Sequence, residues 1–147
     1  MTTPFTPAVR VFAIVSLLLV VKMVAVGSYT SILRLRRKVF ATPEDYALQN
    51  ATPLGVPDED IERIRRAHRN DLENILPFFV VGLIYALTGP SLTAAYVFFG
   101  GFLLARSLHS IFYIRALQPH RTIAFSVGLT LMLVMLVSAL VNLVRMA

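Results

Sequence analysis

The sequence predicts an all-α integral membrane protein, a bundle of four transmembrane helices that form a single domain over residues 1–147. Hydrophobic residues make up 56% of the chain and the mean hydropathy is +0.71, which is too apolar for an ordinary soluble domain. Charges and Gly/Pro turns divide the apolar residues into four blocks, at roughly 8–33, 75–87, 92–105 and 123–144. Since a transmembrane helix needs ~20 largely apolar residues, the lipid bilayer is the expected solvent.

The first and last blocks are long enough to cross a bilayer by themselves. The first is longer than the core of a signal peptide and has no small-residue cleavage site after it, so it is expected to be retained. These two blocks predict helices over about residues 8–36 and 121–145.

The two middle blocks are shorter than a membrane span. They cross only if their helices extend into polar sequence, 61–74 before the second block and 106–114 after the third. We therefore expect helices over about 61–88 and 92–116, joined by the uncharged turn Thr88-Gly89-Pro90-Ser91. The polar ends of both middle helices then lie at the same depth.

The distribution of basic residues predicts which loops are cytoplasmic. Each terminus has one arginine nearby, whereas the last connection has Arg115 and Arg121 and the first has a dense cluster: Arg34, Arg36, Arg37 and Lys38. The positive-inside rule places both connections in the cytoplasm and the N and C termini on the non-cytoplasmic side. The cytosolic loop over about 37–60 also carries two helix-start signals, at Thr42-Pro43 and Pro57-Asp58, each followed by acidic residues.

Several functional classes do not fit this composition. The formal charge is +6, but the basic residues lie at the edges of apolar blocks instead of alternating with aromatic residues, so no nucleic-acid partner is expected. Because the chain has no cysteine, a disulfide, a thiolate metal site and a cysteine nucleophile are excluded, and thiol chemistry requires a thiol from outside. His68 and His120 lack a carboxylate or histidine at metal-ligand spacing, so no metal site is expected.

Polar residues form a stripe on each middle helix. The first stripe has the spacing i, i+3, i+4 and i+7, and consists of Arg66, Arg69, Asn70 and Glu73. The second consists of Arg106, His109, Ser110 and Tyr113.

Two interpretations of these stripes are open. In the first, the arginines extend toward the membrane surface and the acids pair with them. In the second, the stripes line a polar pocket, because each charge costs about 2.5–3.5 kcal/mol at a helix centre and several within three turns need compensation. Such a pocket fits a ligand whose carboxylates meet the arginines and whose amine meets Glu73.

Lys22 lies deep in the first helix and is expected to form a structural ion pair inside the membrane. Asp71 is its expected partner because it faces away from the first stripe. Counting inward from the cytosolic helix ends at about 1.5 Å per residue also places both side chains within the membrane.

Four stretches of the chain resemble a known family. The stretch 62–74 contains the pattern R-A-H-x-N-D-x-E and leads into Pro77. Three further motifs agree in order and spacing: Arg34 to Phe40 with Pro43-Glu44-Asp45, Leu87 to Pro90, and Arg106 to His109 with Tyr113 and Arg121. Over Lys22 to Phe125 the chain resembles the MAPEG family, membrane-associated proteins in eicosanoid and glutathione metabolism.

The resemblance implies a homotrimer with one glutathione at each subunit interface. The residues that match glutathione-binding positions are Arg66, Arg69, Asn70, Glu73, His109, Tyr113 and Arg121, with Arg34 supplied by the adjacent subunit. A thiol with a pKa near ~8.5 is mostly protonated at neutral pH, so a cation must stabilise the thiolate. Arg121 is the candidate, with the Thr122 hydroxyl as a further donor and Asp45 orienting the guanidinium.

The implied activity is a glutathione transferase and peroxidase that acts on lipophilic electrophiles or lipid hydroperoxides from the bilayer. The alternative is a prostaglandin E synthase, a glutathione-dependent isomerase of prostaglandin endoperoxide; Thr122 keeps the hydroxyl of the serine in those enzymes, but Phe125 replaces their tyrosine. A noncatalytic adaptor that presents lipid is a third possibility. The protein is expected in the endoplasmic reticulum membrane of a eukaryote or the inner membrane of a bacterium.

Overall fold

The protein is a bundle of four long helices in the computed structural model, which describes residues 5–53 and 55–146. The elements in chain order are α1 (Pro7–Arg37), α2 (Pro43–Leu48), α3 (Glu59–Leu87), α4 (Leu92–Ala95), η1 (Tyr96–Gly100), α5 (Gly101–Ile114) and α6 (His120–Met146). The segments α4, η1 and α5 follow one another without a break and form one helix over Leu92–Ile114, in which η1 is a short π-helical stretch.

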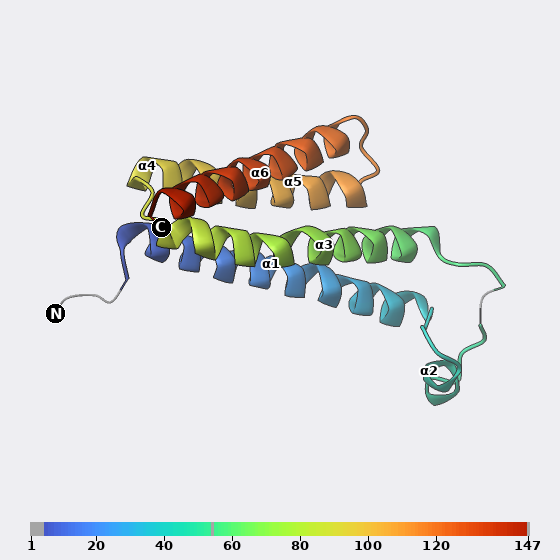
Figure 1. Cartoon of the computed structure of the whole chain (residues 1–147). Helices are drawn as coiled ribbons and strands as arrows, with labels where there is room; N and C mark the ends of the chain where they lie inside the picture. Colours follow the sequence, from blue (N-terminus) through green and yellow to red (C-terminus); the bar gives the residue numbers. More distant parts are fainter. Residues whose placement is uncertain (1–4, 54, 147) are drawn as a thin grey trace.

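All four long helices are long and apolar enough to cross a membrane, which confirms the prediction of an all-α fold with four spans. The connection that contains α2 and the loop between α5 and α6 lie at one end of the bundle (Figure 1). The start of α1, the end of α6 and the turn between α3 and α4 lie at the other end (Figure 1). The charged loops therefore share one end of the molecule.

Side-chain caps explain where the short and middle helices begin. Thr42 caps α2 by accepting a hydrogen bond from the Asp45 backbone N–H at 3.3 Å, with Pro43 as the first helical residue. Asp58 caps α3 by accepting from the backbone N–H groups of Asp60 and Ile61, at 3.0 and 3.1 Å. Both helix starts predicted in the loop are confirmed.

Aromatic side chains pack in the half of the bundle that lies away from the charged loops. Phe78 of α3 stacks on Phe102 of α5 with ring centroids 4.2 Å apart, and Phe12 of α1 contacts Phe78 and Phe99 edge-on or tilted. At Gly82 an added Cβ would lie 2.8 Å from the Phe12 ring, so only glycine permits this approach of α1 to α3. This packing fixes the rotation of α1, α3 and α5 about their axes, and so the direction of their polar residues.

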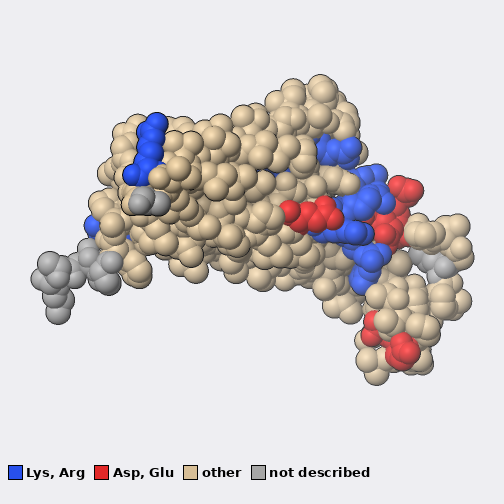
Figure 2. Space-filling model, viewed as in Figure 1, with Lys and Arg blue, Asp and Glu red and all other residues tan. Residues whose placement is uncertain are grey.

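Charged residues are concentrated toward the loop end of the bundle. In Figure 2 most Lys, Arg, Asp and Glu side chains gather there, while the rest of the visible face is almost free of charge. Within this region Arg37 at the end of α1 donates to both carboxylate oxygens of Asp58, at 2.9 and 2.8 Å, and to Asp60 at 2.8 Å. This ion-pair cluster joins the end of α1 to the start of α3.

The Arg37 cluster predicts a loss of stability in acid. Hydrogen bonds from Arg37, and next from the Ile61 backbone, hold the pKa of Asp58 below its usual value of 3.8. A carboxylate whose pKa is lower in the folded state stabilises the fold above its unfolded pKa and loses this effect as pH falls through the folded pKa. We expect Asp58→Asn, which keeps the helix cap, to be less stable than the wild type at pH 7.

The measurement is the thermal unfolding midpoint of both proteins in detergent between pH 7 and pH 2. The difference between them should shrink below a pH of about 4. A difference that stays constant down to pH 2 would show that the Asp58 charge contributes nothing.

Candidate functional site

A buried ion-pair network lies between α1, α3 and α5. Lys22 Nζ is 2.6 Å from Asp71 Oδ1, and Arg106 Nη2 is 2.8 Å from the same oxygen. Lys22 also donates to Ser110 Oγ at 2.6 Å, and Ser110 donates to Asp71 Oδ2 at 3.1 Å. The Asp71 side chain is 0% exposed and that of Arg106 is 1% exposed. The predicted Lys22–Asp71 pair is confirmed, and it is part of a larger network.

The membership of Arg106 in this network was not predicted. The sequence places Arg106 on one face with His109, but it does not show which residue of α3 that face meets. Arg106 Nη2 also donates to Asn70 Oδ1 at 2.7 Å, so the network reaches one of the candidate ligand-binding residues. Arg106 Nε and Nη1 and His109 Nδ1 are buried without hydrogen-bond partners among the described residues.

Lys22 should matter more for folding than for ligand binding. The variant Lys22→Leu removes a short hydrogen bond to Ser110 and an ion pair with Asp71 but leaves Arg106 on Asp71, so we expect a loss of about 1–3 kcal/mol in the free energy of unfolding. Chemical denaturation in detergent gives this value, and calorimetric titration with glutathione, the ligand that the family resemblance implies, gives the affinity, which should change less than twofold. A variant that unfolds like the wild type but binds glutathione weakly would contradict the structural role.

A second cluster lies where α5 ends and α6 begins. The Arg121 guanidinium carbon is 4.5 Å from the centroid of the Tyr113 ring, an arrangement that favours a cation. The ring of His109 is 5.5 Å from that of Tyr113 and 6.1 Å from that of Phe125. His109 is buried, while Arg121 and Tyr113 are partly exposed, so the cluster has a buried floor and an accessible cation.

Gln118 is a further member of this cluster that the sequence did not reveal. It lies in the loop before α6, and its amide is 3.0 Å from the Thr122 hydroxyl. A glutamine in a loop has no periodic pattern or charge that could have marked it.

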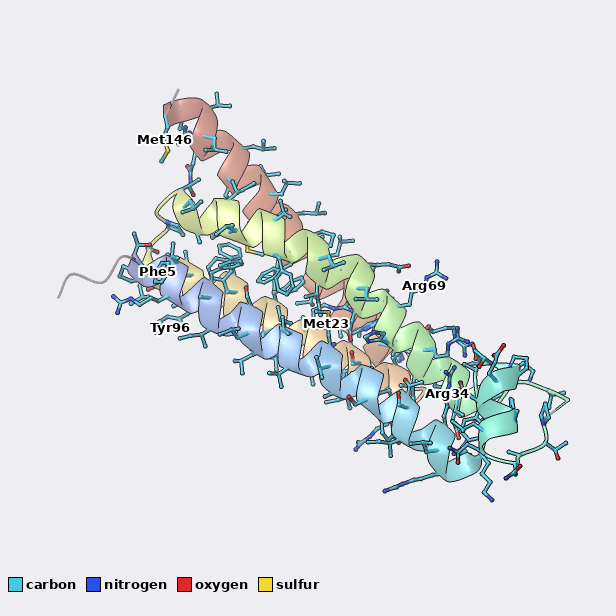
Figure 3. All side chains as sticks on the ribbon, turned by 90° about the horizontal axis from the view of Figure 1, so that it is seen from below. Phe5, Met23, Arg34, Arg69, Tyr96 and Met146 are labelled. Atoms are coloured by element: carbon cyan, nitrogen blue, oxygen red, sulfur yellow. The ribbon has the colours of Figure 1, made fainter. Side chains whose placement is uncertain are left out.

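The polar stripe on α3 faces away from the bundle. Arg69 donates to Glu73 at 3.1 Å, and these side chains are 82% and 56% exposed. Arg66 is also exposed, and Figure 3 shows Arg69 pointing outward from α3. Asn70, in contrast, is turned toward Arg106 inside the bundle. Within one chain, the stripe therefore has one member that contacts the buried network and three that are open to the surroundings.

Arg34 and Asp45 lie near each other where the end of α1 meets α2. They line a cavity of about 260 Å³ between the end of α1 and α2. Within the described part of one chain, no hydrogen bond or ion pair joins either residue to Arg121. One chain thus brings together His109, Tyr113 and Arg121 and links Asn70 to the buried network. Arg34 lines a separate cavity with Arg69, and none of the residues around that cavity belongs to the Arg121 cluster.

The described residues hold no group of three or more His, Cys, Asp or Glu side chains that could bind a metal ion. The chemically distinctive groups are guanidiniums, one imidazole, a phenol, hydroxyls and a carboxylate. Such a set suits the binding of a charged organic ligand.

Comparison with known proteins identifies the family. The model of the MAPEG family matches residues 12–141, a range that includes every candidate residue. The chain belongs to the MAPEG family. The resemblance inferred from the sequence motifs is therefore confirmed.

Curated relatives of this MAPEG chain carry two different names. Microsomal glutathione S-transferase 1 of Rattus norvegicus is 47% identical over 116 residues, which cover 76% of this chain and 75% of the relative. The human protein of the same name is 43% identical over 122 residues, covering 80% and 79%. Prostaglandin E synthase of Equus caballus is 42% identical over 122 residues, covering 82% and 80%. Both groups of MAPEG proteins thus match the chain over most of its length.

Proposed function

We propose that this MAPEG protein is a membrane glutathione transferase and peroxidase that uses glutathione as its thiol. The observation that carries the proposal is Arg121, a partly exposed cation at the start of α6 whose guanidinium lies over the Tyr113 ring beside buried His109. The first turn of α6 adds the partial positive charge of a helix N-terminus. The positive charge of Arg121 and the N-terminus of α6 both stabilise a thiolate.

The charges of glutathione match the side chains around this cluster. Glutathione has two carboxylates, one ammonium group and one thiol. Arg69 and Arg66 are suited to a carboxylate and Glu73 to the ammonium group. Asn70, His109 and Tyr113 offer further hydrogen-bonding groups.

The reaction then follows from the ionised sulfur. The thiol proton leaves to solvent, and the sulfur forms a bond to an electrophilic carbon while the leaving group departs with its electron pair. With a hydroperoxide, the sulfur attacks the terminal oxygen and breaks the O–O bond, which gives a glutathione sulfenic acid and an alkoxide that takes up a proton from solvent to become an alcohol. A second glutathione condenses with the sulfenic acid to give the disulfide and water. Arg121 and the Thr122 hydroxyl stabilise the attacking sulfur.

A lipophilic second substrate is supported by the surface of α5 and α6. An apolar cavity of about 280 Å³ lies between these helices and extends from Gly101 and Leu131 to Phe112 and His120. Since this part of the chain lies in the membrane spans, a compound dissolved in the bilayer reaches it without crossing water.

A homotrimer would complete the site. Glu73 is 14 residues from the end of α3, about 21 Å along a helix, so it lies within a hydrocarbon core of ~30 Å that begins at Leu87. Charged groups exposed at that depth are costly unless they pair with protein or face a polar cavity. A neighbouring subunit that covers Arg69 and Glu73 would provide protein partners for these charges and enclose them in a polar cavity.

The neighbour would also bring Arg34 and Asp45. These two residues share one cavity, so a subunit that contributes Arg34 to glutathione also brings Asp45 close to Arg121. In this arrangement the charged loops and the site face the cytoplasm, and both termini face the other side. The membrane is the endoplasmic reticulum in a eukaryote or the inner membrane in a bacterium.

Isomerisation of prostaglandin endoperoxide is the second candidate activity. It is favoured by the 42% identity to a relative named prostaglandin E synthase. In this reaction the thiolate attacks one peroxide oxygen and breaks the O–O bond, and the other oxygen takes up a proton to become a hydroxyl. Loss of the proton on the carbon that bears the S–O group then forms the ketone, breaks the S–O bond and releases glutathione unchanged. It needs the same cation at Arg121.

One panel of substrates tests the proposal. Purified protein with glutathione is assayed on chlorodinitrobenzene, cumene hydroperoxide and prostaglandin endoperoxide. Turnover of the first two supports the transferase and peroxidase, whereas turnover of the endoperoxide alone supports the isomerase. If the folded protein does not bind glutathione, the enzymatic proposal fails and a lipid-presenting adaptor takes its place.

A further inference from the structure

The amide of Gln118 contacts both residues that would stabilise the sulfur. When the amide oxygen faces Arg121, it accepts hydrogen bonds from Nη2 at 2.6 Å and from Nε at 3.1 Å. The amide nitrogen then donates to Thr122 Oγ1 at 3.0 Å. In the opposite orientation Thr122 would donate to the Gln118 oxygen at 3.0 Å, and the amide NH₂ would face a guanidinium that has only donors. A guanidinium needs an acceptor beside it, so the first orientation is the stable one.

Gln118 and Tyr113 hold the Arg121 guanidinium on two sides. The Tyr113 ring lies against its plane at 4.5 Å, and the Gln118 oxygen occupies the edge formed by Nε and Nη2. The hydrogens on Nη1 lie outside this edge and can face an anion. Because the Gln118 amide is neutral, it fixes the guanidinium without adding a negative charge at this edge.

Gln118 also sets the direction of the Thr122 hydroxyl. A hydroxyl has one hydrogen to donate and two lone pairs to accept with. Since Gln118 donates to Thr122 Oγ1, it occupies a lone pair and leaves the hydroxyl hydrogen free for another acceptor. One amide therefore directs a guanidinium and a hydroxyl as donors at the same time.

We propose that Gln118 is a positioning residue that aims Arg121 and Thr122 at the sulfur of bound glutathione. This inference rests on the function proposed above. Gln118 does not touch the reacting atoms itself. Its loss should therefore reduce turnover and thiolate formation but leave the affinity for glutathione nearly unchanged.

The test uses two substitutions of Gln118 and one control in the full-length protein in detergent. Gln118→Met keeps the size of the side chain and removes its hydrogen bonds, and Gln118→Glu keeps its shape and adds a charge. The control, Leu117→Met, puts the same residue at the neighbouring loop position, where the side chain is exposed and makes no hydrogen bond. Three quantities are measured: kcat with chlorodinitrobenzene, the Kd of glutathione by calorimetry, and the ultraviolet absorbance of the bound thiolate at pH 7.

We expect Gln118→Met to lower kcat at least tenfold, the lower end of the range for residues that orient a catalytic group, with a Kd within about twofold of the wild type. Gln118→Glu should lower the thiolate absorbance further, because its carboxylate neutralises Arg121 and repels the sulfur. Leu117→Met should behave as the wild type.

The outcomes separate this proposal from the function on which it rests. Wild-type kcat and thiolate absorbance in both folded Gln118 variants would overturn the positioning role and leave the proposed function intact. Bound glutathione that remains a thiol in the wild type would overturn the proposed function itself, and the role of Gln118 with it. If Gln118→Met does not fold, Gln118→Glu alone decides, since a thiolate signal equal to that of the wild type would refute the proposal.

Discussion

Replacement of Arg121 by alanine is expected to lower turnover with chlorodinitrobenzene by a factor of about 100–1,000, the range observed when one group that stabilises a developing anion is removed. Arg121 is the cation over the Tyr113 ring at the start of α6. The other groups proposed to bind glutathione lie on other elements and stay in place. Glutathione binding should therefore be retained, with a Kd that rises by less than about tenfold. Most of the loss of activity should appear as a lower kcat.

Two further variants test whether the effect depends on the position and shape of the Arg121 side chain or only on a positive charge. Arg121→Lys keeps a charge but loses the planar fork that Gln118 and Tyr113 hold, so it should recover only part of the activity. Arg115→Ala removes an exposed arginine at the end of α5 and serves as the matched control. If Arg121→Ala forms as much thiolate from bound glutathione near neutral pH as the wild type does, Arg121 does not have the proposed role.

The variant Asp71→Asn is expected to cause the largest loss of stability of any single substitution in the network. Asp71 is fully buried, and both Lys22 and Arg106 depend on it. Without its charge, two cations remain in the bundle, and leaving a buried charge unpaired costs roughly 3–5 kcal/mol. Unfolding in detergent with a chemical denaturant measures this loss.

A control and a rescue accompany the Asp71 prediction. Glu62→Gln removes an acid near the start of the same helix, α3, whose pair with Arg65 lies at the charged loop end of the bundle, and it should cost less than about 1 kcal/mol. The double variant Lys22→Met with Asp71→Asn removes one of the two unpaired cations, so it should be more stable than Asp71→Asn alone. An Asp71→Asn variant as stable as Glu62→Gln would mean that the network contributes nothing to the fold.

Helix geometry explains what could be predicted from the sequence. The number of spans followed from four apolar blocks, and the starts of α2 and α3 followed from Thr42-Pro43 and Asp58. The Lys22–Asp71 pair followed from depth and direction alone, because a rise of about 1.5 Å per residue and a turn of 100° fix both along a helix.

Features that depend on contacts between elements could not be predicted in this way. Arg106 shares a face with His109 by periodicity, but only the packing of α5 against α3 shows that this face meets Asp71 and Asn70. Gln118 lies in a loop, where position is set by the elements on either side. Arg34 and Asp45 lie away from Arg121 within a single chain, so their part in the site depends on an arrangement of subunits that no intrachain pattern specifies.

The central claim is that the cluster around Arg121 keeps the sulfur of bound glutathione ionised. The most direct measurement is a pH titration of the thiolate absorbance of glutathione bound to the wild-type protein in detergent, with free glutathione titrated beside it. The account predicts that the bound thiol is half ionised at a pH at least one unit below the ~8.5 of an unperturbed thiol. Tightly bound glutathione that ionises at the same pH as free glutathione would contradict it.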